Sequence, residues 1–343
     1  MSAPASEFLS APAWLVTALH LVTLTLHLTA MGYVFGGLAS ALLAPRGAEG
    51  PHPATRAFLR SLPSAMAATI TLGVAPLLFL QLVYHRQAYA AAIASAWYWL
   101  GILLAAGIAY ALLYRVALAS GPWGRGTTAL LVIAFAGLLY VSLTYSAIFA
   151  LAESPETIAR LHTADPSGGS FHPDPGAWAV RWLHMLTGAF AIGAFFFGVF
   201  ARKDEALFRH ARRALAAWMV VAMTFGLVYL SLLGPDLMPF MRTAGPVLVT
   251  VGFLLSLGAL HLFFARRFAL AGGLLVTSVF TMVASRHLLR HVRLDGIASA
   301  AALPFQPQWS VLVLFLVCFV LALAVLAYMA RLFFAGRRPA DGL

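Results

Sequence analysis

The dominant feature of the sequence is a series of long apolar segments separated by short polar connections. An α-helix of about 20 residues spans roughly 30 Å of bilayer hydrocarbon, and the sequence contains nine segments of about that length: 14–43, 63–84, 93–114, 127–151, 179–201, 214–233, 246–264, 269–289 and 309–334. Only 10% of the residues are charged and 62% are hydrophobic, which is atypical of a soluble globule. We therefore predict an all-α, polytopic membrane helix bundle in which residues 1–343 form a single transmembrane domain.

The distribution of Lys and Arg predicts the orientation of this bundle. With the N-terminus outside, 15 basic residues fall on the inner side and 7 on the outer side, as the positive-inside rule requires. The net charge of +11 therefore reflects membrane topology and does not indicate nucleic-acid binding. The N-terminal residues lack the basic region of a cleaved signal peptide, so we expect a retained first span. These features predict a multi-pass protein of the bacterial inner (cytoplasmic) membrane, with a periplasmic N-terminus and a cytoplasmic C-terminus.

Two outer features stand apart from this general pattern. The connection 152–178 is the only long one, and it is polar, with four carboxylates among its residues. Arg286, Arg290 and Arg293 form a basic cluster on the predicted outer side, against the positive-inside rule. This cluster suggests a role other than setting topology.

The single cysteine and the positions of the carboxylates exclude several kinds of site. Cys318 is the single cysteine, so the chain has no disulfide framework, no CxxCH motif for covalent haem and no cysteine-ligated cluster. All eleven Asp and Glu residues lie outside the apolar segments or at their edges. Proton pumps, ion-coupled transporters and proton-fed oxygen-reducing sites usually need a carboxylate within the membrane. The sequence therefore disfavours all three.

Histidines within or at the end of apolar segments are the strongest chemical signal. An imidazole at membrane depth is costly unless a haem iron, another polar group or water binds it. Six of the eleven histidines occupy such positions: His20, His27, His184, His261, His287 and His291. We interpret the other five, which lie in connections or near helix ends, as solvated or interfacial.

Helical spacing brings several of these imidazoles toward one level. His20 and His27 are seven residues apart and His287 and His291 are four apart, so each pair shares a helix face. With an outer N-terminus, these residues and His184 fall near the outer surface, except that His27 falls near mid-depth. Imidazoles that converge from facing helices are how bundles hold haem iron.

Two interpretations of this set remain open. Each imidazole could simply bond to a carbonyl or hydroxyl across a helix interface, and for a single histidine this is as favoured as ligation. The set as a whole favours haem, because Arg242, Arg286 and Arg290 could pair with haem propionates. A metal-ion site is less favoured, because only Asp295 accompanies His287 and His291, whereas structural zinc takes four ligands.

Three stretches resemble subunit I of the cytochrome bd quinol oxidases. RWLHMLTGAFAIGAFFFGVFARKDEALFRHARRALA, from Arg181, follows the layout of that family's fifth helix, VHTxxxGYxTGAFxxxGxxA, and of the charged turn GRDxxFAxR after it. The resemblance places His184 on a haem-ligating histidine. LHLTAMGYVFGGLASALL resembles the first helix and places His27 on its haem-ligand histidine and Gly36 on a helix glycine. LGVAPLLFLQLVYHRQAYA, from Leu72, resembles LGVxTGxxxEFQFGxNW, and nine spans with an outer N-terminus are also that family's topology.

The sequence departs from this family at the parts that reduce oxygen. Segment 93–114 has none of the glutamates of the family's third helix. Met282 stands where the TEVGRQ motif has a haem-ligating glutamate, and Ala244 stands where FRxM has a methionine. The long quinol-binding loop after the sixth helix is missing. These losses leave haem ligation possible, and paired histidines would give six-coordinate iron, which favours electron transfer over oxygen binding.

We therefore expect a b-type haem subunit that transfers electrons between the quinone pool and a periplasmic, multihaem c-type cytochrome within a hetero-oligomeric complex. Its axial ligands would be His184 and His27, followed by His20 and His287 and then His291. A quinone site could form at residues 84–87. The alternatives are an oxygen-reducing bd-type terminal oxidase subunit and a haem-free membrane scaffold or transporter subunit.

Overall fold

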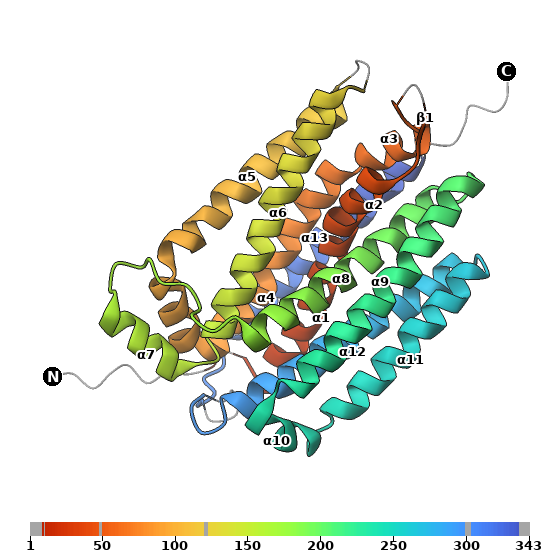
Figure 1. Cartoon of the computed structure of the whole chain (residues 1–343). Helices are drawn as coiled ribbons and strands as arrows, with labels where there is room; N and C mark the ends of the chain where they lie inside the picture. Colours follow the sequence, from red (N-terminus) through yellow and green to blue (C-terminus); the bar gives the residue numbers. More distant parts are fainter. Residues whose placement is uncertain (1–8, 10, 48–49, 120–122, 299–302, 336–343) are drawn as a thin grey trace.

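The computed structural model describes residues 9, 11–47, 50–119, 123–298 and 303–335, and it is a bundle of long helices (Figure 1). In chain order the elements are α1 (Ala13–Met31), the π-helix η1 (Gly32–Gly36), α2 (Gly37–Leu43), β1 (Arg46–Gly47), β2 (Gly50–Pro51), α3 (Pro53–Leu59), α4 (Leu62–Ala94), α5 (Ala96–Leu118), α6 (Arg125–Leu151), α7 (Pro155–Ala164), α8 (Gly176–Phe200), α9 (Glu205–Ser231), the 3₁₀ turn η2 (Gly234–Asp236), α10 (Leu237–Met241), α11 (Gly245–Phe264), α12 (Phe268–Arg293) and α13 (Trp309–Ala335). In these ranges nine helical stretches are long and apolar enough to cross a membrane. The predicted all-α membrane bundle is confirmed.

The two ends of the bundle carry different short elements. One end, called the α7 end here, carries α7 and α10, and the other carries α3 and the β1–β2 hairpin (Figure 1). The sequence-based orientation makes the α7 end the outer one. Helices α1 and α8 both run from the α7 end to the opposite end, so residues early in each helix lie on the predicted outer side.

The centre of the bundle is a close contact between α8 and the segment formed by η1 and α2. A Cβ atom built on Gly36 would lie 1.9 Å from the carbonyl oxygen of Ala189, and one on Gly193 would lie 1.9 Å from the carbonyl carbon of Gly36. Small residues drive such backbone-to-backbone packing in membranes, where lipid is as apolar as leucine. The two glycines therefore fix the depth of α1 relative to α8.

The second span differs most from its predicted boundaries. The prediction ended it at residue 84, but α4 continues to Ala94, with non-helical dihedral angles at Tyr84 (φ −119°, ψ 37°). Residues 85–94 include five alanines, which favour helix. The kink leaves the Tyr84 side chain buried. The predicted polar connection 152–178 also contains a helix, α7, whose Ile158 packs inward.

Candidate functional site

His20 and His27 lie on one face of α1, as their spacing predicted, and both reach α4. His20 Nδ1 lies 3.1 Å from the carbonyl oxygen of Pro76, and His27 Nδ1 lies 3.0 Å from that of Thr69. The two acceptors are also seven residues apart, because α1 and α4 pack side by side in opposite directions. A carbonyl oxygen can only accept, so each Nδ1 carries the proton. In a neutral ring, Nε2 then keeps its lone pair.

His184 repeats this arrangement on a different pair of helices. Its Nδ1 lies 2.7 Å from the carbonyl oxygen of Ala222 in α9. In the part of the chain that the structure describes, Nε2 of His20, His27 and His184 takes part in no hydrogen bond. Three imidazoles thus share one tautomer and one uncommitted nitrogen. Metal-bound histidines have this form, with the other ring nitrogen donating to a carbonyl or carboxylate.

Glycines make two of these contacts possible. In a helix the side chain of residue i+4 lies beside the carbonyl of residue i. Gly73 follows Thr69 by four residues, and Gly226 follows Ala222 by four. A Cβ on Gly73 would lie 2.7 Å from His27 Cε1, and one on Gly226 would lie 3.0 Å from His184 Nδ1. The missing side chains therefore give each imidazole the space to reach its carbonyl.

The structure places His27 and His184 at similar depths and bonds them to different helices. Each lies nine residues before its glycine of the central contact, Gly36 and Gly193 respectively. The prediction of His184 near the surface and His27 near mid-depth therefore overstated their difference. His27 reaches α4 and His184 reaches α9, so the two rings are held by different helices.

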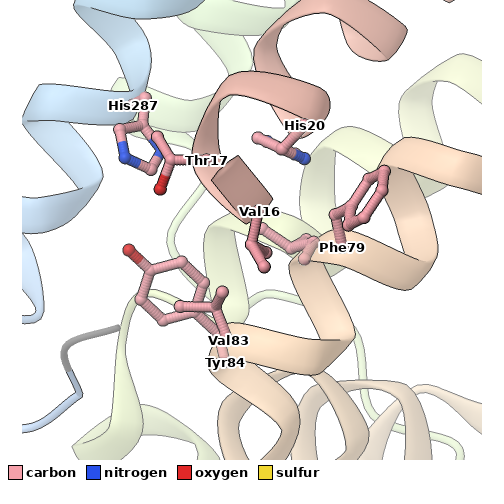
Figure 2. Close-up of a pocket in the computed structure, with 8 residues that line it drawn as sticks. Val16, Thr17, His20, Phe79, Val83, Tyr84 and His287 are labelled. Atoms are coloured by element: carbon pink, nitrogen blue, oxygen red, sulfur yellow. The ribbon is translucent and has the colours of Figure 1, made fainter. Parts of the chain in front are cut away.

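The pair that the structure does bring together is His20 and His287. Their ring centroids are 6.2 Å apart, with the planes inclined by 49°. The two rings, with Tyr84, line a cavity of about 10 Å³ for the centre of a water molecule, which is room for about one water (Figure 2). His287 Nδ1 is buried and has no hydrogen-bond partner among the described residues. This cavity therefore brings together imidazoles from two predicted outer segments, α1 and α12.

A buried carboxylate, Glu153, lies next to this pocket. It follows α6 directly and its side chain is 2% exposed. Arg286 donates to both of its oxygens, Arg290 Nε donates to Oε1 at 3.1 Å and Arg293 Nη1 donates to Oε2 at 3.1 Å. Arg181, from α8, approaches to 3.7 Å. Burial alone would raise the pKa of Glu153, but Arg286, Arg290 and Arg181 outweigh it and hold the pKa well below its usual range.

We call this cluster the Glu153 centre, and it consists of Glu153, Asp236, Arg181, Arg286, Arg290 and Arg293. It carries surplus positive charge. Four guanidinium groups share two carboxylates, since Arg293 Nε also donates to Asp236 at 2.8 Å. The excess is two positive charges. Arg181 Nε and Arg286 Nη1 are buried without a partner in the described ranges. A second water-sized cavity, lined by Glu153, Arg290 and Tyr84, adjoins the histidine pocket through the shared walls Leu80 and Tyr84.

The remaining predicted site residues lie elsewhere. His291 is exposed, as is Arg242 at the end of α10. Arg286 and Arg290 contact Glu153, and their pairing with propionates stays a prediction. Sequence reasoning missed Glu153 and Arg181, and it named Tyr84 only as part of a quinone site at residues 84–87. The signal that could have found the first was the violation of the positive-inside rule by Arg286, Arg290 and Arg293, which calls for a nearby buried anion.

No protein-family model matches the chain, and no curated protein matches its sequence. The residues themselves therefore carry the argument. Among the described residues, no group of three or more His, Cys, Asp or Glu side chains could hold a metal ion. Haem needs only one or two axial side chains from the protein. The Nε2 atoms of His20, His27 and His184 could supply such ligands, whereas the cavity between His20 and His287 has room for about one water.

Proposed function

We propose that this protein is a b-type haem membrane subunit that transfers electrons between the quinone pool and a c-type cytochrome at its outer face. The supporting observation is the shared geometry of His20, His27 and His184, whose Nδ1 atoms bond to main-chain carbonyls and whose Nε2 atoms are uncommitted. A bound haem iron would supply one-electron chemistry by alternating between its ferric and ferrous forms. The chain itself binds, orients and sets the charge around that group.

The ligand residues divide into an outer pair and two inner positions. His20 and His287, whose ring centroids are 6.2 Å apart, would form the outer ligand pair. His27 and His184 would each bind iron through Nε2, because Nδ1 is bonded to a main-chain carbonyl. Arg290 and Arg286, one turn or less from His287 on α12, would neutralise propionate groups.

The environment of these histidines suits electron transfer better than proton-coupled catalysis. Within the described ranges the only carboxylate buried near the rings is Glu153, and four arginines keep it ionised. It is therefore a poor proton donor. A quinone site at residues 84–87 stays a prediction, although the kink at Tyr84 does turn one of these side chains into the bundle.

A pyridine haemochrome assay on the purified protein, with haem-to-protein stoichiometry, tests the proposal. We expect at least one haem b per chain, and we expect His184→Ala and His27→Ala to lower the stoichiometry. His261→Ala is the matched control, because His261 is an exposed histidine of α11 and should leave haem content unchanged. Protein from haem-replete cells without a Soret band would refute the proposal.

One observation favours a second candidate, a haem-free scaffold or transporter subunit. The carbonyl bonds of His20, His27 and His184 already satisfy one nitrogen of each ring, so polar packing accounts for that half of each side chain. This candidate predicts no visible absorbance. It also predicts that His184→Ala changes stability without changing any spectrum.

A further inference from the structure

Two arginines of the Glu153 centre face different neighbours. Arg290 donates to Oε1 of Glu153, and its guanidinium lies 5.9 Å from the centre of the ring of Tyr84, which lines the histidine pocket. Arg293 donates to Oε2, and its Nε donates to Asp236 at 2.8 Å. Asp236 ends η2 and directly precedes α10. The positive charge of the centre therefore extends toward α10 as well as toward the histidines.

Buried polar atoms on the side of Arg293 lack hydrogen-bond partners. Arg181, which is 5% exposed, approaches Oε2 of Glu153 to 3.7 Å, but its Nε has no partner among the described residues. Tyr229 is 8% exposed, its hydroxyl also has no partner there, and it interacts electrostatically with Arg181 and Arg293. Buried polar groups are bonded in nearly all folded proteins, and a buried charge without a partner is costly. Since the centre has a surplus of two positive charges, this side of it lacks an anion.

Arg293 is the member of this side that a ligand can reach from outside. Its side chain is 18% exposed, whereas that of Arg181 is 6% exposed. Its Nε and Nη1 donate to Asp236 and Glu153, which leaves Nη2 without a hydrogen bond in the described ranges, and Nη2 is not an enclosed atom. A guanidinium group matches phosphate oxygens in geometry and charge. A phosphate oxygen at Nη2 would place negative charge beside the surplus without entering the bundle.

The surroundings of Arg293 fit a lipid better than a free anion. Arg293 ends the membrane span α12, so it lies at the level where headgroups meet the hydrocarbon. Helix α10 packs against α12 through Phe240 and Leu289 at this end of the bundle (Figure 1). Met238 and Met241 of α10 are 62% and 52% exposed. A free anion would leave this apolar surface bare, whereas the acyl chains of a phospholipid would cover it.

We infer that Arg293, supported by the charge of Arg181, binds the phosphate group of an anionic phospholipid at the α7 end, with the acyl chains against α10. Basic pockets between spans bind such headgroups. A choline headgroup carries its own positive charge and would leave the surplus unpaired, so an anionic headgroup should bind more tightly. Because the site joins the ends of α8, α10 and α12 and exists only in the folded protein, the lipid should stabilise the fold. None of these contacts requires haem.

Thermal unfolding of the purified full chain in detergent tests the inference, with phosphatidylglycerol, phosphatidylcholine or inorganic phosphate added at matched ionic strength. We expect phosphatidylglycerol to raise the unfolding midpoint and the other two to raise it much less. Arg293→Gln should lower the apparent affinity for phosphatidylglycerol by about tenfold, because it removes a charge-assisted hydrogen bond. Asp236→Asn should raise that affinity, because it removes a negative charge that competes for Arg293.

Arg160→Gln is the matched control, because it removes one positive charge from an exposed position on α7 at the same end of the bundle. It should leave the affinity unchanged. The inference is refuted if phosphatidylglycerol stabilises the wild type no more than phosphatidylcholine does, or if Arg160→Gln weakens its effect as much as Arg293→Gln. Equal stabilisation by inorganic phosphate would assign the site to a free anion and would also overturn it.

A second variant covers the case in which Arg293→Gln does not fold. Asp236→Asn keeps Arg293 in place, and an affinity that does not rise in this variant would contradict the role assigned to Arg293. Haem content enters none of these measurements. The outcome for the lipid site and the outcome for the proposed function can therefore be told apart.

Discussion

The contact between Gly36 and Gly193 gives the sharpest test of the fold that positions the histidines. In Gly193→Ala the new Cβ would lie 1.9 Å from the Gly36 carbonyl carbon and 2.1 Å from the Gly37 nitrogen. Ordinary carbon contacts are about 3.5–4.0 Å, so the two helices must separate by well over 1 Å. Overpacking typically costs about 1–3 kcal/mol. Here the clash is with backbone, which no rotamer change relieves, and we expect about 3 kcal/mol or more.

Gly188→Ala is the matched control on the same helix. Its Cβ would have no atom within 4 Å among the described residues, and replacing glycine by alanine within a helix is favourable by roughly 0.5–1 kcal/mol. Unfolding of both variants by SDS or heat in detergent micelles gives the comparison. If Gly193→Ala were within about 0.5 kcal/mol of Gly188→Ala, the close helix contact would be wrong, and with it the relative depth of His27 and His184.

Three further outcomes follow from the site. Gly226→Ala should displace the His184 ring and lower or broaden its haem signal. Gly273→Ala, which adds a Cβ into open space, should leave that signal unchanged. An unchanged spectrum in Gly226→Ala would contradict the claim that the glycine gives His184 its space. The folded state holds the pKa of Glu153 below the value of about 4.3 expected for the unfolded chain. The stability that Glu153 contributes is therefore complete above about pH 4.3 and is lost as the pH falls below it. The difference in unfolding midpoint between wild type and Glu153→Gln should shrink on acidification, and a constant difference would contradict this reasoning. Six-coordinate iron should bind no carbon monoxide when reduced, so a carbon monoxide difference spectrum of full amplitude would favour the oxidase alternative.

Local patterns predicted much of this molecule because their physics is local. Apolar segments of bilayer length identified the spans, and a seven-residue spacing placed His20 and His27 on one helix face, which their bonds to α4 confirm. The extent of α4 was missed because the polar residues 84–87 suggested a connection. In the fold they are covered in part by packing, and both Tyr84 and Gln87 are buried.

The Glu153 centre could not be predicted in the same way. Its arginine partners are separated from it by 28 to 140 residues in sequence. Glu153 itself reads as one of several carboxylates in a polar connection. Its burial depends on how α6, α8 and α12 end at one level, which is a property of the assembled bundle. Only the excess of arginine on the wrong side of the membrane hinted that an anion had to be present.

The Glu153 centre also bears on the orientation of the chain. Four of the seven basic residues assigned to the outer side, Arg181, Arg286, Arg290 and Arg293, belong to it. Their charge is engaged within the fold, so only three outer basic residues remain to oppose the fifteen on the inner side. The positive-inside bias is therefore stronger than the raw count suggests.

Cysteine labelling in intact cells tests this orientation, since Cys318 is the single native cysteine and Cys318→Ser removes the background. In that background, Thr163→Cys in exposed α7 should react with a membrane-impermeant maleimide in intact cells. Any outer membrane must first be made permeable to the reagent. Lys203→Cys, in the exposed turn between α8 and α9, should react only after lysis. The reverse pattern would place the Glu153 centre on the cytoplasmic side and would exclude a periplasmic electron acceptor next to His20 and His287.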